Sequence, residues 1–163
     1  MSARKIVGVL GLITLLLSLV VHLLTYRNIN LAEAYPRAVG TLFPVVIAIF
    51  IFTIIHLYLK IGNRPPFHVF YAHTLARMPF WTWIILPVFF AYLVLSIFLF
   101  GSGLAVPDQA DGKYIINNHG QITEYTLEEV ERIKLYQLRS YSGFWMWLTL
   151  CSTLYLLTAK NDD

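Results

Sequence analysis

Histidines offer this chain its most versatile chemistry, because imidazole binds metals and haem and exchanges protons near neutral pH. Four of the five histidines are candidates for a polar site within or beside long apolar runs: His22, His56, His68 and His73. His22 and His56 lie inside such runs, whereas His68 and His73 lie in the segment that joins two of them. The question is whether any of them converge.

The spacing of these histidines matches no metal-binding motif, and we predict no bound metal or cofactor. If successive runs cross a membrane in opposite directions, His22 and His56 lie near opposite faces and form a poor pair of haem ligands. His56, His68 and His73 could meet at one face. A membrane enzyme or haem protein that uses them is therefore an alternative, although we favour structural roles.

His22 continues a stripe of small and polar residues along the first apolar run, with Gly11, Thr14 and Ser18. Steps of three and four residues place these side chains on one face of a helix. Small side chains let two membrane helices approach closely, and hydroxyls form hydrogen bonds between them. We predict that this face packs against another helix and that His22 lies near the helix end, where water is accessible.

The residue types that catalysis usually needs are scarce in the apolar runs. None of the runs contains a carboxylate, which argues against a proton-coupled transporter. Their Ser and Thr residues lack an evident base, so nucleophilic catalysis is unsupported. The single cysteine, Cys151, excludes an intrachain disulfide, and we interpret it as a small buried residue. We therefore do not expect an enzyme.

The composition indicates a lipid-facing protein. Of the 163 residues, 58% are hydrophobic and 13% are charged, against roughly 25% charged in soluble domains. We predict an all-α integral membrane protein, a single membrane domain over residues 1–163 with four transmembrane helices in a bundle. The predicted spans are residues 6–24, 38–59, 80–100 and 141–159, each near the ~20 residues that a crossing requires. The fourth is the weakest, because it contains several Ser and Thr residues.

Residues 101–140, between the third and fourth spans, are predicted to form an extramembrane insertion, which we call the hairpin–helix module. Two β-prone segments, residues 113–117 and 121–125, flank the turn sequence Asn118-His119-Gly120 and predict a β-hairpin. Thr126 and Glu129 then have the spacing of a capping box, which begins a helix.

We expect that helix to cover residues 127–139 before the chain turns into the fourth span near Gly143. Its apolar face would hold Leu127, Val130, Leu138 and Tyr141. Glu128 and Arg132 are spaced for an ion pair on the opposite face. Glu131 and Lys134 interrupt the apolar face, where we expect them to pair with each other. With the hairpin turn, that opposite face is our candidate interaction surface: Asn118, His119, Glu128, Arg132, Tyr136 and Arg139.

The basic residues predict an orientation, because Lys and Arg near short loops favour the cytoplasmic side. Six of them share one predicted side: Arg4, Lys5, Lys60, Arg64, Arg77 and Lys160. Arg27 and Arg37 lie on the other. We predict that both termini are cytoplasmic in the inner (plasma) membrane of a bacterium, with the module on the opposite face.

The expected contacts of this chain are the lipid bilayer and another protein, either a partner or a second copy bound through helix faces or the module. Basic residues are too dispersed for a nucleic-acid surface. We predict a noncatalytic accessory, assembly or interaction subunit. The remaining alternative is a small transporter or channel component that acts as an oligomer.

Overall fold

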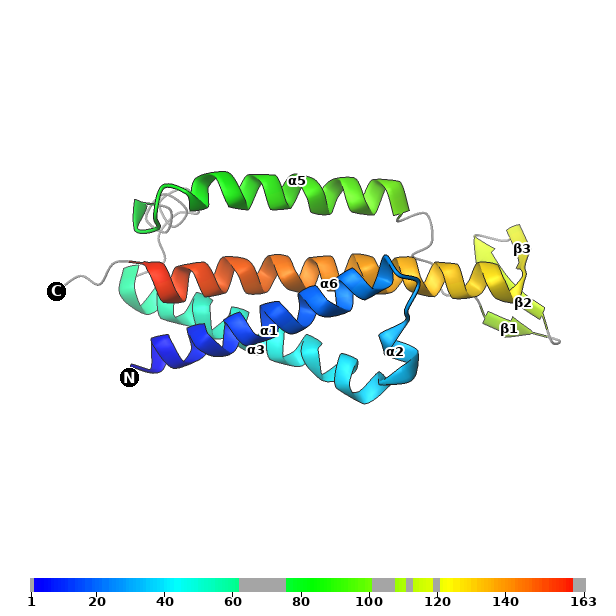
Figure 1. The fold of residues 1–163 in the computed structure, drawn as a ribbon, viewed down its shortest axis with the longest axis horizontal. Helices are drawn as coiled ribbons and strands as arrows, with labels where there is room; N and C mark the ends of the chain where they lie inside the picture. The colour runs from blue at the N-terminus through cyan, green and yellow to red at the C-terminus, as the bar shows by residue number, and fades with distance from the viewer. Residues whose placement is uncertain (1, 62–75, 101–107, 111–112, 119–120, 160–163) are drawn as a thin grey trace.

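The computed structural model describes residues 2–61, 76–100, 108–110, 113–118 and 121–159. Its long helices are α1 (Ala3–Thr25), α3 (Pro36–Ile61), α5 (Thr82–Phe100) and α6 (Leu127–Thr158), and α2 (Leu31–Ala34) is a single turn. The strands are β1 (Asp108–Ala110), β2 (Lys113–Asn118) and β3 (Gln121–Tyr125). Figure 1 shows the long helices running lengthwise together, with the sheet at the amino-terminal end of α6.

Among the described residues, three helices are long and apolar enough to cross a membrane: Ala3–Thr25, Pro36–Lys60 and Thr82–Leu99. They confirm the first three predicted apolar runs as helices. The fourth run is also helical, as part of α6, but among the described helices it falls short of the same hydropathy. Its hydroxyl and aromatic residues account for that difference.

The exposed and buried faces of α1 are inverted relative to a helix of a water-soluble protein. Its buried residues are mostly small or polar: Gly8, Gly11, Thr14, Ser18, Val21, His22 and Thr25. Large apolar side chains such as Leu16 and Leu23 point outward. The predicted small and polar face is therefore confirmed as a packing face, and its main partner is α6. The expectation that water reaches His22 is wrong, because the residue is buried.

Glycines on α1 bring its backbone close to α6. A Cβ added at Gly8 would lie 2.5 Å from Leu157 Cδ2, and one added at Gly11 would collide with Thr153 Oγ1. At the end of the same interface, Arg4 Nε donates to the Leu156 carbonyl at 2.8 Å, and Arg4 Nη2 donates to the Ala159 carbonyl. Arg4 thereby satisfies carbonyls that the end of α6 leaves without helical partners. The start of α1 and the end of α6 thus lie together.

α6 is one continuous helix of 32 residues, about 48 Å long at 1.5 Å per residue. The predicted turn near Gly143 is wrong, because the chain remains helical through that residue. Glycine costs a helix about 1 kcal/mol relative to alanine, but here it makes room for two neighbouring helices. A Cβ at Gly143 would lie 3.2 Å from Leu93 Cδ1 and 3.5 Å from His22 Cε1.

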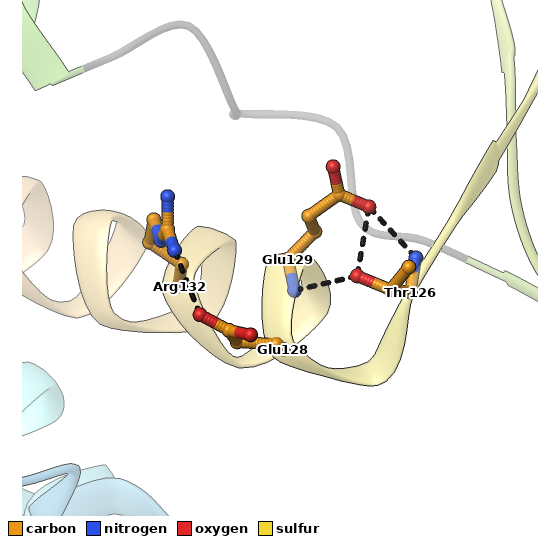
Figure 2. Close-up of polar contacts among 4 residues, drawn as sticks. All are labelled: Thr126, Glu128, Glu129 and Arg132. Atoms are coloured by element: carbon orange, nitrogen blue, oxygen red, sulfur yellow. Dashed lines mark hydrogen bonds and ion pairs between the residues drawn. The ribbon is translucent and has the colours of Figure 1, made fainter.

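The start of α6 has both local features that its sequence predicts (Figure 2). The Thr126 hydroxyl accepts from the Glu129 amide at 3.3 Å, and Glu129 Oε2 accepts from the Thr126 amide at 2.8 Å. These hydrogen bonds from Thr126 lower the pKa of the Glu129 carboxyl. One turn along, Arg132 donates to Glu128 at 3.0 Å. The capping box and the i,i+4 ion pair are confirmed.

The predicted β-hairpin is confirmed as well. β2 pairs with β3 in antiparallel register, with Asn118 opposite Gln121, so a two-residue connection joins them. β1 adds a third strand that the sequence analysis did not predict, in the order β1-β2-β3. Its three residues are too few to carry a strand pattern. His119 and Gly120 lie outside the described residues.

We predict different effects of the same substitution at two helical glycines. Gly11→Ala will lower the thermal unfolding midpoint in detergent, because the added methyl group meets Thr153. Gly40→Ala is the matched control: its Cβ meets no atom within 4 Å, so the better helix former will leave the midpoint unchanged or raise it. Equal midpoints for both variants would contradict the close α1–α6 contact.

Candidate functional site

His22 is the centre of a hydrogen-bond network that joins α1, α5 and α6. Its side chain is 3% exposed. Nε2 lies 2.5 Å from the Tyr92 hydroxyl of α5, and that hydroxyl lies 2.8 Å from the Tyr26 hydroxyl. Nδ1 lies 3.1 Å from the Arg139 carbonyl oxygen and 3.0 Å from Ser142 Oγ, both on α6. We call these five residues the His22 network.

The partners of His22 determine which ring nitrogen carries the proton. The Arg139 carbonyl can only accept, and the Ser142 hydroxyl already donates to that carbonyl at 3.1 Å. Nδ1 must therefore donate, which in a neutral imidazole leaves Nε2 to accept from Tyr92. The Tyr92 oxygen in turn accepts from Tyr26. The result is a directed chain from Tyr26 through Tyr92 and His22 to the backbone of α6.

Arg139 connects the same network to the end of α1. Its Nε donates to Thr25 Oγ1 at 3.1 Å and its Nη2 donates to the Thr25 carbonyl at 2.9 Å. Its guanidinium carbon lies 4.0 Å from the centre of the Tyr26 ring, a cation–π contact. A cation here is favourable because the carboxyl end of a helix carries partial negative charge.

The predicted place of Arg139 on an exposed face is wrong, since the residue is 6% exposed. Arg132 and Arg139 are one heptad apart and share a side of α6, and Arg132 is exposed. At the level of Arg139, however, the carboxyl end of α1 covers that side with Thr25 and Tyr26. Burial therefore changes along one helix face as α6 passes its neighbour.

Other expectations for this part of α6 were met in part. Val130 and Leu138 are buried, whereas Leu127 and Tyr141 are exposed, so only half of the expected apolar face packs inward. The expected Glu131–Lys134 pair is wrong, because Lys134 donates instead to Glu33 of α2 at 3.1 Å. The structure describes the backbone of Asn118 at the end of β2, and it places Tyr136 half-buried, with its ring centre 5.5 Å from the Arg139 guanidinium.

His56 belongs to a different part of the bundle. It contacts the rings of Phe52 and Tyr155, and the Tyr155 hydroxyl lies 3.5 Å from its Nδ1. Tyr155 follows Arg139 by sixteen residues, about 24 Å along α6, so His22 and His56 do not share a site. His68 and His73 lie outside the described residues. Within the described ranges, no three His, Cys, Asp or Glu side chains are grouped closely enough to hold a metal.

The arrangement around His22 is suited to joining helices. Both ring nitrogens are engaged, one as donor and one as acceptor, so a metal would have to displace an existing partner. Tyr92 and Tyr26 were absent from the predicted site, although the sequence holds a signal for each. A tyrosine hydroxyl in the middle of an apolar run requires a partner, and Tyr26 follows His22 by one helical turn.

Comparisons with protein-family models, curated proteins and solved structures gave no match to this chain.

We predict that the two tyrosine hydroxyls of the network differ in importance. Tyr92→Phe leaves the buried Nε2 of His22 without a donor, which costs about 1–3 kcal/mol of unfolding free energy. Tyr26→Phe will cost less, because Tyr92 keeps its bond to His22 and water can replace the hydroxyl of the exposed Tyr26. Thermal unfolding in detergent measures both. A larger loss for Tyr26→Phe would contradict the direction of the hydrogen-bond chain.

Proposed function

We propose that this chain is a four-span membrane protein that acts as a noncatalytic interaction subunit, and that it presents the hairpin–helix module to a protein partner. The observation that carries the proposal is the continuity of α6. One helix of 32 residues runs from the bundle to the residue that follows the capping residue Thr126 without a described break, so the helical part of the module extends directly from the bundle.

The length of α6 supports a fourth span with an extension beyond it. Residues 139–158 are sufficient for a hydrocarbon core of about 30 Å. Residues 127–138 then extend roughly 18 Å further, toward the sheet at the end of the molecule (Figure 1). The Ser and Thr residues that weaken the apolar signal of this span are compatible with it, because several face the bundle or bond to their own helix. Thr149, for example, is buried and donates to the Trp145 carbonyl.

The module exposes the combination of residues that binding surfaces use. Ile122 is 64% exposed and Leu127 is 56% exposed. The module also carries two exposed ion pairs, Lys113–Glu124 in the sheet and Glu128–Arg132 in the helix (Figure 2). Apolar residues with a charged surround are typical of protein interfaces. Lipid covers exposed apolar residues along the spans, but it does not reach the far end of an extension of this length.

The test is to exchange the charges of one ion pair. The double variant Glu128→Arg, Arg132→Glu keeps an ion pair of the same spacing but reverses the pattern offered to a partner. A rim charge mainly affects association and specificity, so we expect the copurified partner to be lost from mild-detergent preparations while the thermal unfolding midpoint changes little.

The matched control exchanges Glu33 and Lys134, an exposed ion pair between α2 and α6 that is not part of the candidate interaction surface. This variant should retain the partner. If the Glu128–Arg132 exchange leaves every copurified protein at its wild-type amount, the interaction role of this surface is refuted.

We further propose that both termini are cytoplasmic and that the module lies on the opposite face. The six basic residues grouped near the predicted inner ends support this orientation. The contact between Arg4 and the end of α6 supports the part of it that puts the start of α1 and the end of α6 on the same side. Single cysteines at Ser2 and Gln121, in a Cys151→Ala background, test it. In intact cells an impermeant thiol reagent should label Gln121→Cys and not Ser2→Cys; the reverse pattern inverts the topology.

A further inference from the structure

An apolar pocket of about 530 Å³ lies between α1, α5 and α6, within the range usual for small-molecule sites. Leu19 and Leu23 of α1 line one wall, Ile84, Val88 and Phe89 of α5 line the other, and Met146 of α6 forms part of the remainder. α5 packs chiefly against α6. α5 and α1 are connected by the His22–Tyr92 hydrogen bond beside the pocket.

The polar atoms beside the pocket are already occupied. His22, Tyr26 and Tyr92 line it, but their nitrogen and hydroxyl groups bond to one another and to α6. A ligand therefore meets the carbon atoms of these rings and the aliphatic side chains. A polar or charged group placed there would lose its hydration without gaining a partner. The pocket therefore favours a hydrocarbon group of a ligand over a polar or charged one.

The shape of the pocket favours a chain over a compact ring system. Its lining extends from Ile84 to Tyr92 on α5, about 12 Å, and from Leu19 to Tyr26 on α1, about 10 Å. Several residues that line it are more than half exposed: Leu23 at 54%, Ile84 at 57% and Val88 at 64%. The pocket is thus open sideways, along the faces of two helices that are apolar enough to cross a membrane.

We propose that this pocket holds one acyl chain of a bilayer phospholipid. The inference depends on the membrane location and not on the partner role of the module. Lipid tails gain no hydrophobic energy by leaving the bilayer for an apolar wall, but an unfilled groove forfeits the dispersion contacts of its lining. A chain between two helices contacts protein on more sides than a chain on a convex surface does, so it is retained longer during purification.

The experiment uses native mass spectrometry of the full chain, delipidated in detergent and then titrated with dioleoyl phosphatidylglycerol. We expect a single lipid adduct on the wild type. Val88→Trp fills the pocket from α5, and Leu19→Trp fills it from α1; each should weaken the adduct by about tenfold or more, which is 1.4 kcal/mol. Leu95→Trp is the matched control, because Leu95 is exposed on α5 but does not line the pocket, and it should bind as the wild type does.

Dioleoyl phosphatidylethanolamine separates chain recognition from headgroup recognition. If the pocket holds the chain, both lipids bind with similar affinity and respond alike to the tryptophan variants. The proposal is overturned if both pocket variants bind lipid as the wild type does, or if Leu95→Trp weakens the adduct equally. It is also overturned if the wild type is a dimer that binds no lipid and the pocket variants convert it to monomers, because a second copy of the chain then fills the pocket. None of these outcomes depends on the Glu128–Arg132 exchange.

Discussion

The close contact between α1 and α6 is the constraint on which the rest of the molecule depends. Lipid tails are as apolar as leucine, so helices in a bilayer are held together mainly by packing and hydrogen bonds. Gly8 and Gly11 supply the packing by allowing the backbone of α1 to approach Leu157 and Thr153. At one end of this interface Arg4 binds the last carbonyls of α6, and at the other Arg139 binds the last carbonyl of α1. Each arginine thus donates hydrogen bonds to carbonyl groups at the carboxyl end of the other helix.

The His22 network uses this contact to add a third helix. Buried hydrogen-bonding groups are costly unless they are satisfied, and Nε2 of His22 obtains its donor from Tyr92 of α5. α5 itself is almost entirely apolar, and its outward face offers little that would fix its rotation. The Tyr92 hydroxyl and the packing of Phe89 and Phe90 against Trp147 of α6 therefore favour one rotation of α5 about its axis. The same selection turns Val88 and Phe89 toward the pocket beside α1.

Features determined by neighbouring residues were predictable from the sequence, and features determined by distant ones were not. The apolar runs, the hairpin, the capping box at Thr126 and the Glu128–Arg132 pair all depend on spacings of a few residues. The packing face of α1 was also predictable, since steps of three and four residues define it. The burial of Arg139 depends on Thr25, which is 114 residues away, and the partner of Lys134 is 101 residues away. Gly143 was misjudged because local propensity disfavours glycine in a helix, whereas contacts with Leu93 and His22 decide its conformation.

The pairing of α1 with α6 has a consequence for biogenesis. Contacts between groups so distant in the chain cannot form until the ribosome has made both, and long-range contacts also form slowly. In the proposed membrane topology, α1 enters the bilayer before α6 exists, so His22 then lacks the Arg139 carbonyl and Ser142 hydroxyl to which its Nδ1 later bonds. An intermediate of this kind exposes an imidazole N–H that lipid cannot satisfy. Insertion of α1 before α6 is therefore a stage at which a membrane insertase or chaperone has a surface to hold.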